Sequence, residues 1–220
     1  MSLASDELIV TSQLQAIPIR WEENIIGIDA DIANLRASLR GATAHAHDLL
    51  DQTMRAASGW TSRSDYRRFL SLQHAARMPV EQWIALNAPP AFCPPPQCHL
   101  IERDLRALGW SPEDNASEFS LTCRSEGDST ALGVAWVLAG SSLGNRAILK
   151  EVKRVAADSA TEEWPCSFLG DDAMPAFWKQ LRPHIEQSAS HNKLEAASRA
   201  ANAVFDHFLK ITISTGRVSA

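Results

Sequence analysis

The sequence predicts an all-α protein with a single multi-helix domain. Three observations support this prediction. First, apolar residues recur at intervals of three and four from about residue 32 to the end of the chain. Second, no pair of alternating strand patterns follows residue 30. Third, 220 residues with 45% apolar content suit one large domain or two small ones. We expect an N-terminal arm over residues 1–30, a helical domain over 31–214 and a tail over 215–220.

The first half of the predicted domain contains three helices separated by proline and glycine signals. The first helix begins near residue 32, and its apolar stripe comprises Leu35, Leu39, Ala42, Ala46 and Leu49. A second helix is expected over Ser64–Leu86, with Ser64 as its N-cap and Pro79 as a break or kink. The proline-rich segment 88–96 predicts an extended loop, and a third helix over His99–Leu108 should end at Gly109.

The second half predicts three further helices. A long apolar helix is expected over Thr130–Ala156, after a polar and turn-rich stretch at 110–128. Residues 171–188 are helical in pattern, with a kink at Pro183, and Asp171 and Asp172 complement the helix dipole at the start. The last helix is an amphipathic one over Asn192–Ile213.

Composition excludes several classes of protein. A net charge of −5 argues against a nucleic-acid reader, and four cysteines do not make a disulfide scaffold. Four residues separate Cys93 from Cys98, which is two more than a Cys-x2-Cys zinc knuckle has, so a plain loop is expected there. The uncharged run 82–101 contains five prolines and 129–145 has only 17 residues, so no membrane span is expected. We expect a soluble cytoplasmic protein without a signal peptide.

The first predicted helix carries a histidine that suits iron ligation. At about 100° per residue, His47 lies within about 20° of Arg40 at the edge of the apolar stripe, whereas His45 points to the opposite side. A neutral imidazole binds heme iron, and an arginine two turns away can hold a carboxylate at the porphyrin edge. The alternative is a half-buried histidine that is bonded to a backbone carbonyl.

The long apolar helix has an unusual glycine pair. Gly140 and Gly144 lie one turn apart on one face, where the backbone can approach a flat ligand closely. Ser141 and Asn145 are placed to hold water molecules beside that face. The alternative is tight packing of this helix against another through small residues.

These two helices together resemble those of heme oxygenases, in particular the bacterial enzymes that supply biliverdin to bacteriophytochromes. The resemblance covers about residues 33–212. It rests on Leu39-Arg40-x-x-Thr43-x-x-x-His47, on the segment from Val137 to Gly144, and on the later segments Phe168–Gly170, Phe177–Leu181 and Ala200–Phe205.

The resemblance implies a heme held between the first helix and the glycine helix. His47 would be the proximal iron ligand, and Gly140 and Gly144 would border the distal face. Arg40, Lys179 and Arg182 would bind the heme propionates, while Ser141 and Asn145 would order catalytic water. The family usually has an acid at the position of Ala139 and a second glycine at that of Asn145, and both departures affect the distal water network.

The implied activity is oxidative cleavage of heme to biliverdin, iron and carbon monoxide. O2 is consumed, and a reductase or ferredoxin supplies the electrons. A bacteriophytochrome would be a candidate acceptor of the bilin. Two alternatives stay open: a non-catalytic heme or bilin carrier on the same scaffold, which the absence of an acid at Ala139 favours, and another enzyme of this helical superfold, such as a thiamine-degrading or quinone-forming type.

Overall fold

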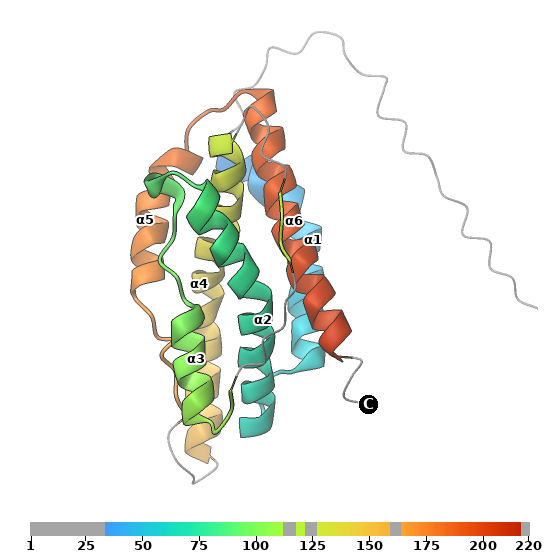
Figure 1. Cartoon of the computed structure of the whole chain (residues 1–220), viewed down its shortest axis with the longest axis vertical. Helices are drawn as coiled ribbons and strands as arrows, with labels where there is room; N and C mark the ends of the chain where they lie inside the picture. Colours follow the sequence, from blue (N-terminus) through green and yellow to red (C-terminus); the bar gives the residue numbers. More distant parts are fainter. Residues whose placement is uncertain (1–33, 112–117, 122–126, 159–163, 217–220) are drawn as a thin grey trace, which may run out of the picture. The chain divides into compact units, whose positions relative to one another are not determined.

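The computed structural model describes residues 34–111, 118–121, 127–158 and 164–216. This part of the chain forms six α-helices and one short 3-10 helix, and its only β pairing is a single bridge between Asn34 and Ser188. The elements are α1 (Leu35–Ala57), α2 (Arg63–Asn87), η1 (Pro90–Phe92), α3 (Cys98–Ala107), α4 (Gly127–Asp158), α5 (Ala173–Ile185) and α6 (His191–Gly216) (Figure 1). The predicted all-α fold is confirmed.

Three predicted segments lie wholly or largely outside the described residues. They are the arm over 1–30, most of the tail over 215–220 and much of the turn-rich stretch at 110–128.

Side-chain oxygens cap the starts of α1 and α2. The Asn34 side chain accepts the backbone N–H of Arg36 at 2.9 Å, and Ser62 accepts that of Asp65 at 3.1 Å. Ser62 therefore caps α2, and the prediction of Ser64 was wrong by two residues. Such caps stabilise a helix by about 1 kcal/mol each because they satisfy backbone donors that have no partner within the helix.

The structure contradicts part of each of two predictions about prolines. α2 runs without interruption through Pro79, which is buried, so Pro79 does not break the helix. A proline inside a helix costs about 3 kcal/mol, which burial of the neighbouring Val80 and Trp83 can offset. The loop after α2 is not extended throughout, because Pro90 begins the 3-10 helix η1, where its missing N–H costs nothing. The predicted end of α3 is confirmed, since Gly109 follows it with φ of 74°.

Helix α6 packs against both α1 and α4, and these are the most extensive helix contacts of the bundle. Figure 1 shows α6 and α1 side by side, with α4 and α2 in the middle of the bundle. One apolar core joins α4, α5 and α6 with parts of α1 and α2. A second core gathers Tyr66, Trp164 and Phe168 with residues of α2, α3 and α4.

The outer part of α1 is more exposed than its sequence predicts. Of the predicted apolar stripe, Leu35 and Leu39 are buried, but Ala42 and Leu49 are exposed. No residue from 44 to 53 is buried. The prediction of a continuous buried stripe was therefore wrong for the second half. The reason is that α1 packs mainly against α6 alone, so one flank of this stretch lacks a neighbouring helix among the described residues.

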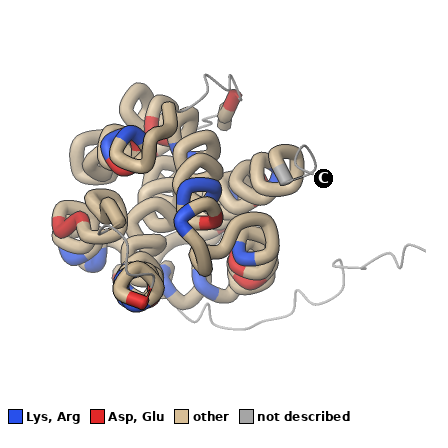
Figure 2. Tube along the Cα trace, turned by 90° about the horizontal axis from the view of Figure 1, so that it is seen from below, with Lys and Arg blue, Asp and Glu red and all other residues tan. Residues whose placement is uncertain are grey.

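Basic and acidic residues are mixed along the helices. Figure 2 shows lysine and arginine positions interspersed with acidic ones.

Helix α4 is long and apolar enough to cross a membrane by length and composition, but 44% of its most apolar window is buried inside the protein. A core helix of a soluble protein has the same properties, so α4 is weak evidence for a membrane span.

Candidate functional site

His47 lies on the exposed part of α1, with its ring against α6. Its side chain is 56% exposed, and its Nδ1 is 3.5 Å from Oδ2 of Asp51 and 3.7 Å from Oδ1 of Asp48. The ring meets that of Phe205 edge-on, with centroids 5.8 Å apart. Because Nδ1 faces these carboxylates, Nε2 lies on the opposite side of the ring. A ligating histidine in proteins usually has this arrangement, with one nitrogen oriented by a carboxylate and the other free for a metal.

Asp51 is a neighbour of His47 that the sequence analysis did not single out. The signal was present, because Asp51 follows His47 by four residues and such residues are neighbours on a helix. His45 is exposed as well. It therefore remains a suitable comparison for His47.

The glycines of α4 have different surroundings. A Cβ atom on Gly133 would come within 2.2 Å of the carbonyl oxygen of Ala197 in α6, so close packing requires this glycine. At Gly140 the nearest atom would be Cζ3 of Trp178 at 3.8 Å, an ordinary contact, and at Gly144 nothing lies within 4 Å. The packing explanation therefore applies to Gly133. Neither Gly140 nor Gly144 is required by contacts with described residues.

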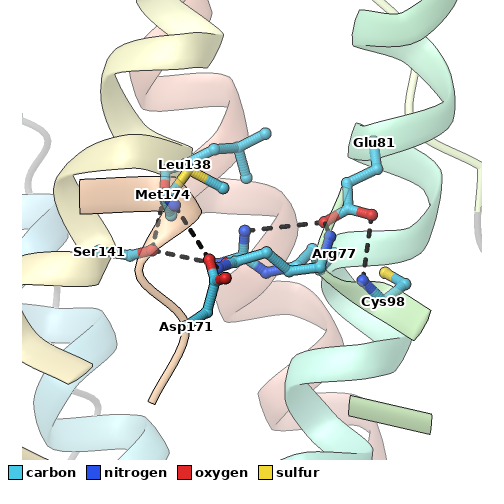
Figure 3. A network of polar contacts seen from close by, with 8 residues as sticks. Arg77, Glu81, Cys98, Leu138, Ser141, Asp171 and Met174 are labelled. Carbon is cyan, nitrogen blue, oxygen red and sulfur yellow. Dashed lines mark hydrogen bonds and ion pairs between the residues drawn. The ribbon is translucent and has the colours of Figure 1, made fainter. Parts of the chain in front are cut away.

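Ser141 and Asn145 lie beside this glycine pair. The Ser141 hydroxyl donates to the carbonyl oxygen of Leu138 at 2.8 Å and accepts from Nη2 of Arg77 at 3.0 Å (Figure 3). Its proton is already used, so toward a bound water molecule Ser141 can only accept. Asn145 is buried, with 8% of its surface exposed.

Ala139 lies on the other side of α4. It is completely buried in the first core, about 140° around the helix from Gly144. Packing therefore explains its small side chain. We call the side of α4 that carries Gly140 and Gly144 the glycine face. The absence of an acid at position 139 therefore says little about chemistry on the glycine face.

The three predicted propionate partners differ in availability. Arg40 on α1 and Lys179 on α5 are exposed and make no ion pair with any described residue. Arg182 is already engaged, since its Nε and Nη2 donate to Oε1 of Glu186 at 3.1 and 2.9 Å. Glu186 also binds Nη1 of Arg36 at 3.3 Å and so links the end of α5 to the start of α1.

The described residues contain no cluster of three or more histidine, cysteine or acidic side chains that could hold a metal ion. Cys98 is buried at the start of α3, and its burial and the nearby Glu81 raise the pKa of its thiol above the usual range. This thiol is therefore neutral and a poor metal ligand.

Comparisons with known proteins bear on the fold. The sequence matches no family model and no curated protein. The structure is similar to the crystal structure of the NO- and CO-bound heme oxygenase from Neisseria meningitidis, with a TM-score of 0.66 and 19% sequence identity. The match covers 85% of this chain and 94% of the Neisseria chain. The protein therefore has the all-α fold of a bacterial heme oxygenase.

Proposed function

We propose that this protein is a heme-degrading oxygenase that converts heme to biliverdin, iron and carbon monoxide. The observation that carries the proposal is His47 on the first helix of a heme oxygenase fold, half-exposed and with its Nδ1 3.5 Å from Oδ2 of Asp51. O2 and electrons from a reductase or ferredoxin would be consumed. Such donors operate in a reducing compartment, so a cytoplasmic location belongs to the proposal, and a bacteriophytochrome is the proposed acceptor of the bilin.

The residues present fit a heme. Nε2 of His47 would hold the iron, and Asp51 would fix the ring orientation and raise the basicity of the imidazole. Gly140 and Gly144 leave the α4 surface without side chains, as a flat macrocycle requires. Arg40 and Lys179 are free to pair with propionates, whereas Arg182 would first have to release Glu186.

Bound heme supplies the iron at which O2 is reduced and the ring that is cleaved. The chain must orient the heme, exclude bulk water and hold the waters that deliver protons. Ser141 would contribute as an acceptor because its own proton goes to Leu138, and Asn145 would be the neighbouring amide. Both roles are part of the proposal.

A non-catalytic heme or bilin carrier is the second candidate. It would use the same His47 and the same glycine pair. Its main support was the missing acid at Ala139, and that support is weakened because Ala139 faces the core. A different enzyme of this superfold would not need an exposed histidine backed by a carboxylate.

One experiment separates these functions. The full chain is titrated with heme and followed by absorption, and ascorbate is then added in the presence of O2. We expect a protein-bound Soret band that decays while bilin absorption grows. A stable Soret band would indicate a carrier, and the absence of a protein-bound heme spectrum would exclude both heme functions.

A further inference from the structure

A buried arginine of α2 contacts α4, the helix that carries Gly140 and Gly144. Arg77 of α2 is the largest of the completely buried side chains in the described part of the chain. Its Nη2 donates to Oγ of Ser141 at 3.0 Å (Figure 3), and its guanidinium lies 5.4 Å from the centre of the Phe168 ring. Removing a charge from water is costly unless it is well paired, so the partners of Arg77 matter.

The positive charge of Arg77 is only loosely compensated. The nearest carboxylate oxygen, Oε1 of Glu81, is 3.9 Å from Nη1. Both oxygens of Glu81 already accept backbone N–H groups, from Gln97 at 2.8 Å and from Cys98 at 3.2 Å. Nε and Nη1 of Arg77 have no hydrogen-bond partner among the residues that the structure describes. Burial lowers the pKa of Arg77, but an arginine keeps its proton in proteins.

Of the other neighbouring groups, Asp171 carries a carboxylate, but its Oδ2 accepts from Gln97 and Met174 at 2.9 Å and it forms no ion pair with Arg77 in the described structure (Figure 3). The Cys98 thiol is neutral, because burial raises its pKa. Phe168 offers only its ring face, which favours a cation without neutralising it. The field of Arg77 is therefore incompletely balanced, in a buried setting where solvent screens it weakly.

Ser141 connects the charged guanidinium of Arg77 to the glycine face through a hydrogen bond. At about 100° per residue, Ser141 lies about 60° around α4 from Gly144, so it borders the surface that those glycines leave bare. Its hydroxyl proton points to Leu138, and its oxygen is turned to Arg77. The Arg77–Ser141 hydrogen bond thus holds the guanidinium against α4 just behind this face.

We propose that Arg77 is a positioning residue that, held by Ser141, gives the glycine face a fixed positive potential and makes it favour small anionic ligands over neutral ones. The identity of the site as a heme site rests on the proposed function. The electrostatic argument rests on the burial and loose pairing of Arg77. A charge in this position would favour anionic oxygen-derived ligands on the open side of the iron.

The test compares anionic and neutral ligands of the ferric heme complex. Dissociation constants for fluoride, azide and imidazole are measured by absorption at one fixed pH, for the wild type, Arg77→Met, Arg77→Lys and Ser141→Ala. We expect Arg77→Met to weaken fluoride and azide binding by roughly three- to tenfold and to leave imidazole binding unchanged. Arg77→Lys should retain most of the anion affinity.

Ser141→Ala keeps the charge and removes the hydrogen bond that holds it, so it should have a smaller effect in the same direction. It also provides the test if Arg77→Met does not fold, as judged by thermal unfolding of the heme-free protein. The double variant Arg77→Met/Ser141→Ala should be no weaker for anions than Arg77→Met alone.

Two results would overturn the proposal about Arg77 alone: unchanged anion affinity, or an equal loss for fluoride, azide and imidazole, which would indicate a purely structural role. A wild-type chain that binds no heme would overturn the proposed function as well. The heme titration, made first, distinguishes these failures.

Discussion

Gly133 and the pair Gly140 and Gly144 occupy different surroundings on α4. Gly133 faces the backbone of α6 so closely that an added Cβ atom would lie 2.2 Å from the oxygen of Ala197. Two turns further on, Gly140 has only an ordinary contact at 3.8 Å, and Gly144 has open space. Packing thus requires the first glycine and leaves the other pair unexplained. A ligand that lies against Gly140 and Gly144 would explain them.

Two histidines show the same difference between packed and open regions. His207 on α6 is buried between the rings of Phe119 and Phe208, at centroid distances of 5.3 and 6.4 Å. His47, whose ring also touches α6, is half-exposed with its Nδ1 toward a carboxylate. The packed region therefore holds a histidine whose pKa is lowered by burial, and the open region holds one that is exposed to a ligand.

The largest effect on stability should come from Gly133→Ala. Because the backbone of Ala197 cannot move aside cheaply, α4 and α6 would have to separate, at a cost of about 3 kcal/mol. Gly144→Ala is the matched control in the same helix and should stabilise the heme-free protein by about 1 kcal/mol. Urea unfolding measures both. Equal changes in the two variants would contradict the contrast between Gly133 and Gly144.

The next effect concerns ligand binding. Gly144→Leu should leave the heme-free protein at least as stable as the wild type, since the position is open and leucine favours helix by nearly 1 kcal/mol. Heme affinity should fall by about tenfold or more because the side chain would occupy the ligand face.

The control for this variant is Gly41→Leu. Gly41 lies on α1 and also has nothing within 4 Å of an added Cβ, so the helix-propensity gain is the same. Its heme affinity should match that of the wild type. A normal heme titration for Gly144→Leu would remove the main evidence for a ligand at this face.

The smallest effect is the pH dependence of the packed region. Burial lowers the pKa of His207 below its usual 6.5. As the pH falls through that value, the unfolded chain takes up a proton before the folded protein does, so the free energy of unfolding decreases. His207→Leu should reduce the stability difference between acidic and neutral pH by less than about 1 kcal/mol.

Urea unfolding at the two pH values measures this difference, and His191→Gln, at the exposed start of α6, is the control. If His207→Leu and wild type lose the same stability at acidic pH, His207 does not contribute.

The sequence pattern predicted the helices well because apolar spacing determines which face is buried. It named Ser64 instead of Ser62 as the cap of α2, since a cap depends on which side chain reaches the N–H groups. It also allowed a break at Pro79, which is absent because a helix can tolerate a proline when its neighbours are buried. The exposure of the second half of the apolar stripe of α1 could not be predicted either, because the spacing of apolar residues alone does not show whether a neighbouring helix is present.

For the site, local spacing was informative and long-range contacts were not. His47, Gly140 and Gly144 stand out by spacing on single helices, and Asp51 could have been found in the same way. Arg77 carries no local signal, because its partner Ser141 is 64 residues away in the sequence. Only the packing of α2 against α4 reveals this contact.

Axial ligation of heme iron by His47 is the central claim, and it has a direct test. The iron–histidine stretch of the ferrous heme complex is measured by resonance Raman spectroscopy in the wild type, His47→Ala and His45→Ala. Both histidines are exposed on α1, so both variants should fold, with stability losses below about 1 kcal/mol. We predict that the band is lost in His47→Ala, returns with added imidazole as an iron–imidazole band, and is unchanged in His45→Ala. A wild-type band in His47→Ala would contradict the account.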